Sequence, residues 1–177
     1  MIPSEKDKIS FLLKNPIFLL NDLKISKIDN LNIYKDNMKE LYLQRNGIST
    51  IENLDFLENL EVLSLGNNYI TKIQNLTQLK KLEILDLSNN LIDTLEHKNL
   101  PLSLHYLYLY DNPFFNTLTE YDVRYSCINY FPKLINIDSL EVTFRERHIC
   151  SGSKINKKYI NKGECMYIAD HYRYINT

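Results

Sequence analysis

Three tyrosines in the stretch YLYLYD are the side chains whose type and spacing point most directly to chemistry. Tyr106, Tyr108 and Tyr110 alternate there with Leu107 and Leu109. Alternate residues of a strand project from the same face, so the rings stand together if both leucines point into the core. Tyrosine combines apolar area with a polar tip and often anchors protein interfaces. It is also a good strand former, so the three rings can simply fill exposed strand positions.

Catalysis and metal binding find little support in the sequence. His105 occupies the alternate register from Tyr106 and is expected to face a different side. No serine or cysteine has a nearby histidine by sequence logic. Two spacings, His-x-Cys and Cys-x₅-His, match no common zinc motif and comprise His148, Cys150, Cys165 and His171. Four glycines are too few for a phosphate-cradling loop. We therefore expect a protein that is not an enzyme and has no metal, cofactor or small-molecule substrate.

The elements that position the tyrosines belong to an internal repeat. Segments beginning at Met38, Leu60, Leu82 and Leu104 align at intervals of 22 residues. Two leucine columns do not vary, and they contain Leu41, Leu63, Leu85 and Leu107, and Leu43, Leu65, Leu87 and Leu109. One asparagine column is also constant and contains Asn46, Asn68, Asn90 and Asn112. In a degenerate first copy, Phe18 and Leu20 fall in the leucine columns and Leu23 falls in the asparagine column.

The repeat has a simple physical interpretation. Leu-x-Leu is the pattern of a strand of about three residues with one buried face, which is stable only when stacked on its neighbours. A buried asparagine beyond it bonds backbone groups of adjacent coils, so we assign the four asparagines a structural role. Ile70, Ile73, Leu76 and Leu79 then recur every three residues, which favours a 3₁₀ turn or short helix packing back on the core.

Residues that alternate with the leucines are predicted to face the open, concave side of the sheet. Function in such a scaffold belongs to these variable positions. The predicted partner-binding residues are Tyr42, Arg45, Val62, Ile84, Asp86, Tyr106, Tyr108, Tyr110 and Asp111. Five strands span roughly 19 Å, a width that suits a helix or a folded edge of another protein.

This pattern resembles the short intracellular class of the leucine-rich-repeat family, whose units have 22 residues and a second half of the form I-x-x-I-x-N-L-x-x-L. Residues 112–142 are similar to the C-terminal cap of that class. The matching positions are Asn112, Pro113, Tyr125 or Arg124, Pro132, Leu134, Ile137 and Asp138. The fourth repeat departs from the pattern by lacking regular leucines after Leu95, and its Leu-Pro-x-Ser-Leu junction is similar to that of some ciliary members.

The fold class implied by the resemblance is α/β: a leucine-rich-repeat solenoid with a short parallel β-sheet on the concave face. The convex face is expected to carry 3₁₀ turns or short helices, with helical caps at both ends. The expected division is an N-terminal capping helix over residues 1–15, five repeats over 16–111, a C-terminal cap over 112–150, and a basic, tyrosine-containing tail over 151–177. Cys127 falls in the cap helix and is expected to be a small buried hydrophobe.

The resemblance also implies a function. Members of the class include axonemal dynein light chains, regulatory subunits of a protein phosphatase and a spliceosomal ribonucleoprotein subunit. We expect a protein-binding adaptor with an axonemal or cytoskeletal role; the alternatives are a phosphatase regulator and a structural ribonucleoprotein subunit. The expected partner is a protein held in the concave groove by a monomer.

Composition adds little to this expectation. The net charge of −1 gives no bias toward nucleic acid or membrane, and only the basic tail offers a contact for RNA or an acidic surface. No stretch has the length of a membrane span, and Lys14 and Pro16 interrupt the apolar segment near the start. Three irregularly spaced cysteines indicate reduced thiols. The expected location is the cytoplasm, with the cilium or axoneme and the nucleus as alternatives.

Overall fold

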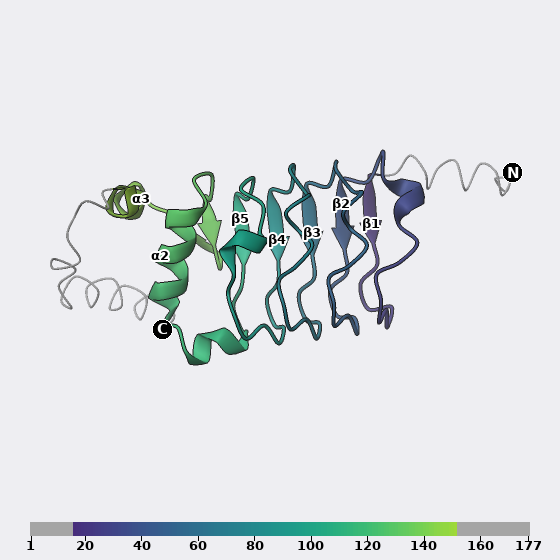
Figure 1. Cartoon of the computed structure of the whole chain (residues 1–177), viewed down its shortest axis with the longest axis horizontal. Coiled ribbons are helices and arrows are strands. Elements are labelled where there is room, and N and C mark those ends of the chain that lie inside the picture. Colours follow the sequence, from purple (N-terminus) through teal and green to yellow (C-terminus); the bar gives the residue numbers. More distant parts are fainter. Residues whose placement is uncertain (1–15, 152–177) are drawn as a thin grey trace, which may run out of the picture.

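A solenoid built on one sheet makes up residues 16–151, the part of the chain that the computed structural model describes (Figure 1). Its five successive parallel strands are β1 (Ile17–Leu19), β2 (Glu40–Tyr42), β3 (Val62–Ser64), β4 (Ile84–Asp86) and β5 (Tyr106–Tyr108). Each strand has three residues. Strands this short are stable only in a stack, so the sheet forms as neighbouring coils pack together. The predicted leucine-rich-repeat fold class is confirmed.

The register of the sheet follows the leucine columns of the sequence. Leu41 pairs with Leu63, and Leu85 pairs with Leu107. Phe18 pairs with Leu41, which confirms the alignment of the degenerate first copy. The leucines of these columns in the second to fifth coils are at most 1% exposed. Burial of one constant column therefore fixes the register of every strand.

The convex side is made of single tight turns and short 3₁₀ helices, as the three-residue recurrence predicts. Two such helices are η1 (Asn32–Tyr34) and η2 (His97–Asn99). Between them, the amide of Leu57 donates to the carbonyl of Leu54, and the amide of Leu79 donates to that of Leu76. These bonds join residues three apart, which is the 3₁₀ pattern. The leucines of these turns complete the core from the side opposite the strands.

The C-terminal cap contains η3 (Pro113–Asn116), α2 (Glu120–Tyr130), β6 (Asn136–Ile137), β7 (Leu140–Glu141) and α3 (Phe144–Ser151). Strand β6 continues the parallel sheet beside β5, and β7 returns antiparallel to it. Asp138 and Ser139 make that reversal with φ values of 50° and 67°, the backbone of a two-residue hairpin turn. The sequence reasoning treated this segment as cap alone and did not anticipate the two additional strands.

Two arginines fasten the cap. Arg124 of α2 binds Glu146 of α3 with Nε 2.6 Å from Oε1, and both residues are buried. The same guanidinium donates to the carbonyls of Ile137, Leu140 and Glu141. Arg147 of α3 donates to three carbonyls at and beyond the end of α2, those of Ile128, Phe131 and Leu134. Arg124, rather than Tyr125, is therefore the buried polar anchor at this point of the cap motif.

Some expectations fall outside the residues that the structure describes, namely the N-terminal capping helix over 1–15 and the tail from residue 152 onward. Within residues 16–151, no helix has the length and apolar character needed to cross a membrane.

Candidate protein-binding face

We call the open side of β1 to β5 the concave face; it consists of the residues that alternate with the buried leucines and of those that follow each strand in the turn. Tyr106 and Tyr110 are 36% and 43% exposed on this face, and Tyr108 between them is half-buried. Leu107 and Leu109 are fully buried, so the alternation predicted for this stretch is present. Of the three tyrosines, two belong to β5 and Tyr110 lies two residues beyond its end. They form a row at the C-terminal end of the repeats.

The centre of the concave face is polar, and Asp86 there is bonded to serines of β3 and of the turn after β4. Its Oδ2 accepts from the Ser64 hydroxyl at 2.9 Å, and its Oδ1 accepts from the Ser88 hydroxyl at 2.6 Å and the Ser88 amide at 3.0 Å. Ser64 and Ser88 are buried. A Cβ at Gly66 would lie 2.6 Å from Asp86 Oδ2, so any larger residue there would displace the Asp86 carboxylate. Asp86, predicted as a partner contact, thus also organises the floor of the face.

One hydrogen-bonded pair and one ion pair occupy the side of the concave face near the start of the solenoid. The Tyr42 hydroxyl donates to Glu40 Oε2 at 2.8 Å, and this bond raises the pKa of Tyr42. Arg45 donates two hydrogen bonds to Asp22, at 2.7 and 2.8 Å, which lower the pKa of the Asp22 carboxyl. Both members of the Asp22–Arg45 pair are exposed, so the pair orders side chains more than it stabilises the fold.

A left-handed backbone turn ends each strand at the same position. The residues there have φ between 51° and 60° and are Asp22, Arg45, Asn67, Asn89 and Asp111. Asparagine and aspartate tolerate this conformation better than other residues with a Cβ. Arg45 is the exception, and it is also the residue that pairs with Asp22. Arg45 and Asp111, both predicted as partner contacts, are therefore exposed at the rim of the face.

The remaining predicted contacts, Val62 and Ile84, are half-buried in the first column of the concave face. Leu19 on β1 lies on the same face and is 68% exposed, and Glu40 lies in the same column as Val62. Both alternate with the buried columns, so the sequence predicts that they face the open side, although they are not among the nine predicted partner contacts. The structure thus places all nine predicted residues on one side of the sheet or at its rim.

The asparagine column runs through the solenoid as a ladder of buried amides. Asn68 donates to the carbonyl of Leu43 in the preceding coil and of Leu65 in its own, each at 3.0 Å, and accepts from the Ile48 amide at 3.0 Å. The other three residues of the inner ladder, Asn46, Asn90 and Asn112, each donate to carbonyls of two coils and accept from an amide of the preceding coil. One side chain per coil therefore joins adjacent coils.

A second ladder lies on the convex side and was not identified from the sequence. Asn53, Asn75 and Asn99 donate to the carbonyls of Ile28, Ile51 and Ile73 in the preceding coils, at 2.8 to 2.9 Å. The first two have φ of 55° and 59°. The recurring asparagine of the I-x-x-I-x-N-L half-repeat was the available signal.

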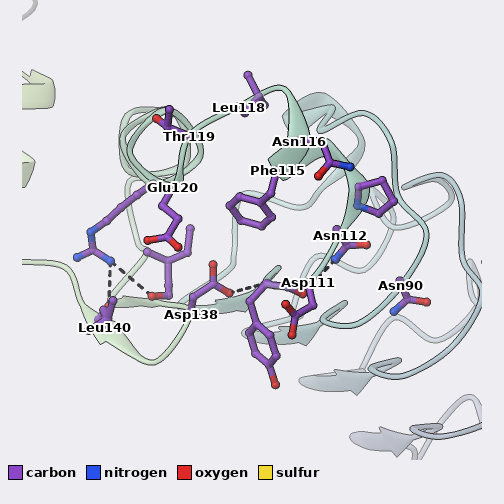
Figure 2. A pocket seen from close by; sticks show the side chains of 14 residues that line it. Asn90, Asp111, Asn112, Phe115, Asn116, Leu118, Thr119, Glu120, Asp138 and Leu140 are labelled. Atoms are coloured by element: carbon purple, nitrogen blue, oxygen red, sulfur yellow. Dashed lines mark hydrogen bonds between the residues drawn. The ribbon is translucent and has the colours of Figure 1, made fainter. Parts of the chain in front are cut away.

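An open pocket of about 780 Å³ adjoins the tyrosine row where the last repeat meets the cap. Figure 2 shows three carboxylates around it: Asp111 after β5, Glu120 at the start of α2 and Asp138 after β6. Asp138 accepts from the amides of Leu109 and Tyr110, at 2.6 and 3.1 Å. Burial raises the pKa of Asp138, against the effect of these two bonds. The pocket connects the concave face with the cap.

Cys127 is a buried core residue, as expected, and its Sγ lies 3.6 Å from His97 Nε2. Burial raises the pKa of the Cys127 thiol to about 12, which keeps it protonated and unreactive at neutral pH. His105 is half-buried before β5. In residues 16–151, no cluster of three or more His, Cys, Asp or Glu is arranged to hold a metal ion. His148 and Cys150 lie in α3, whereas Cys165 and His171 are outside the described residues.

Comparison with known proteins identifies the repeats. Residues 58–101 match the family model "Leucine Rich repeats (2 copies)". The chain is a leucine-rich-repeat solenoid. Such domains are typically non-enzymatic scaffolds that bind protein partners. A search of curated proteins found no significant match.

Solved structures include similar leucine-rich-repeat proteins. One similar chain comes from the Drosophila melanogaster SNF/U2A′ complex, with a TM-score of 0.68 and 26% identity over 82% of this chain and 87% of that one. Another is the leucine-rich-repeat protein LIC12759 of Leptospira interrogans, with a TM-score of 0.51 and 29% identity over 64% of this chain and 28% of that one. The functional domain of Listeria monocytogenes InlJ, at 21% identity and a TM-score of 0.53, shares the fold; the match covers 75% of this chain and 32% of that one.

Proposed function

We propose that the protein is a non-enzymatic adaptor that binds a protein partner on its concave face, with the tyrosine row as the anchor. The observation that carries this proposal is the row itself: Tyr106 and Tyr108 on β5, and Tyr110 just beyond it, alternate with two fully buried leucines. The sheet fixes the backbone of this row, and a tyrosine side chain has only two torsions to order when a partner binds. Binding therefore costs little side-chain entropy, which favours affinity.

The experiment is the triple variant Tyr106→Ala, Tyr108→Ala, Tyr110→Ala in the full chain, compared with Tyr69→Ala. Tyr69 is 59% exposed but belongs to the turn after the asparagine column, away from the row. A hot-spot tyrosine contributes roughly 2 kcal/mol or more, about a thirtyfold change in affinity. An exposed position usually changes stability by less than about 0.5 kcal/mol.

Both variants are expected to keep a cooperative thermal transition. The triple variant is expected to lose the partners that the unaltered chain and Tyr69→Ala capture from a lysate, identified by mass spectrometry. A folded triple variant that retains every partner would remove the tyrosine row from the proposal.

A second candidate is a structural subunit of a ribonucleoprotein, and the likeness to a chain of the SNF/U2A′ complex favours it. That match covers most of both chains, so the two proteins share their overall architecture. The shared architecture supports a protein partner within a complex for this chain as well. The axonemal or cytoskeletal role and the phosphatase-regulator role stay predictions from the sequence resemblance. Localisation of the tagged chain separates the three, because they place it in the nucleus, in the cilium or throughout the cytoplasm.

A further inference from the structure

Carboxylates without a cationic partner line the same face as the tyrosines. Glu40 on β2, Asp86 on β4 and Asp111 after β5 all belong to the concave face. In the described part of the chain, no lysine, arginine or histidine forms an ion pair with any of the three. Arg45 is the cation on this face in residues 16–151, and Asp22 already binds it through two hydrogen bonds.

The negative charge continues into the pocket beside Tyr110. Asp111, Glu120 and Asp138 surround that pocket (Figure 2). Arg124 also lines it, but its guanidinium is bonded to Glu146 and to backbone carbonyls of the cap. The cations of residues 16–151 therefore do not neutralise the acidic character of the face.

A partner that covers this face must supply counter-charges. Burying a carboxylate without a partner is costly, whereas a complementary charge steers association and fixes the register of the bound segment. Exposed tyrosine rings next to carboxylates also suit an arginine, which can stack on a ring while its fork bonds an acid. Five strands give a face roughly 19 Å wide, enough for one helix.

From this charge complementarity we infer that the segment held on the concave face is a cationic α-helix of a partner protein, with arginine or lysine along the side that meets Glu40, Asp86 and Asp111. This inference rests on the proposed function and specifies the chemistry of the partner. The competing occupant is the chain's own segment 152–177, which has five Lys/Arg and two Asp/Glu. The experiment distinguishes the partner helix from this segment.

The probes are three synthetic amphipathic helical peptides of equal length and identical apolar residues, with arginine, glutamine or glutamate at the polar positions. Their binding to the full chain is measured by fluorescence anisotropy at low and at physiological salt. The test variant is Glu40→Gln with Asp111→Asn, because asparagine tolerates the left-handed backbone at position 111. The matched control is Asp55→Asn with Glu58→Gln, which removes the same charge from two exposed convex residues.

The arginine peptide is expected to bind most tightly and to weaken with salt. The Glu40/Asp111 variant should lower the affinity of the arginine peptide roughly fivefold to thirtyfold, because each of the two lost charge pairs contributes about 0.5–1 kcal/mol. The control variant should leave that affinity unchanged. Equal binding of the three peptides, stronger binding of the glutamate peptide, or no binding of the arginine peptide would overturn the inference.

Two further variants separate the inference from the proposed function. If Tyr106→Ala weakens the glutamine and arginine peptides equally and charge has no effect, the tyrosine anchor stands and the cationic partner is excluded. If the arginine peptide binds Lys157→Glu with Lys158→Glu but not the unaltered chain, the occupant is the chain's own segment and the partner assignment is overturned.

Discussion

Buried backbone groups are bonded by neutral amides in the repeats but by charged guanidinium groups in the C-terminal cap. Each asparagine of the inner ladder serves two coils, and every coil presents the same carbonyls at the same place. In the cap, no further coil follows within the described residues. Arg124 and Arg147 instead reach three carbonyls each, and Glu146 neutralises Arg124.

The difference shows that the arrangement of the backbone carbonyls determines which side chain can bond them. A short amide suffices where coils repeat at the strand spacing, because donor and acceptor always lie a fixed distance apart. At the end of the stack the orphan carbonyls are scattered over a hairpin and the end of a helix. A long side chain with five donors can collect them, but its charge then requires a buried counter-ion.

Replacing Arg124 by leucine should produce the largest loss of stability, about 3–5 kcal/mol. The change leaves Glu146 buried without its guanidinium and removes one donor each from the carbonyls of Ile137, Leu140 and Glu141. Urea denaturation measures the loss. The double variant Arg124→Leu with Glu146→Leu is the control, and it should recover part of the stability because no buried charge remains. A loss below about 1 kcal/mol for the single variant would contradict the assignment of Arg124 as the anchor of the cap.

Replacing Asn68 by leucine should cost less, on the order of 1–3 kcal/mol. Leucine has a similar size but cannot bond the carbonyls of Leu43 and Leu65 or the amide of Ile48. The measurement is again the free energy of unfolding. An unchanged thermal melt would show that the inner ladder does not hold the coils together.

The sequence revealed the repeats far better than the cap, and for a physical reason. Twenty-two-residue periodicity exposes the core columns of the repeats, because each column records the same burial several times over. The register of Phe18 with Leu41 followed from that periodicity alone. Glu146 and Arg147 lie outside the repeats and have no counterpart in another coil. No comparison between repeats could therefore identify them as partners of α2.

Side-chain networks within the candidate site were equally hidden. Asp86 could be assigned to the concave face by alternation, but its bonds to Ser64 and Ser88 depend on rotamers and on the missing Cβ of Gly66. The pocket beside Tyr110 joins the segment after β5 with α2, β6 and β7, and its lining runs from Asn90 to Leu140. Only the folded chain brings these segments together.

Replacing Asn75 by alanine should cost about 1 kcal/mol, less than the change at Asn68. The outer ladder offers one strong bond per coil, here from Asn75 to the carbonyl of Ile51 at 2.8 Å, and the residue is exposed. Part of the loss comes from the left-handed backbone at φ 59°, which alanine disfavours. Asn75→Gly separates the two effects, because glycine adopts that backbone freely and lacks only the bond. If Asn75→Ala destabilised the chain as much as Asn68→Leu, the two ladders would be equivalent.

The smallest expected effect is the dependence of cap stability on pH, which the neutral ladders lack. Burial disfavours the charged form of Glu146, but hydrogen bonds from Arg124 and Thr143 outweigh it and hold the pKa of that carboxyl below its usual range. A carboxyl whose pKa is lower in the folded chain stabilises it above the unfolded pKa, and this contribution is lost as pH falls through the folded pKa.

Asp138 has the opposite sign, because burial raises its pKa and its contribution is lost as pH rises through the folded value. The effects of the two carboxyls on stability partly cancel, so the stability of the unaltered chain depends only weakly on pH. The informative quantity is therefore the difference in melting temperature between the unaltered chain and Glu146→Gln at each pH. Melting temperatures between about pH 7 and pH 3 should fall further for the unaltered chain than for Glu146→Gln, which starts lower and cannot lose the ion pair again. Parallel curves for the two proteins would show that the Arg124–Glu146 pair does not couple protonation to folding, and that the cap, like the repeats, is held by interactions that acid leaves intact.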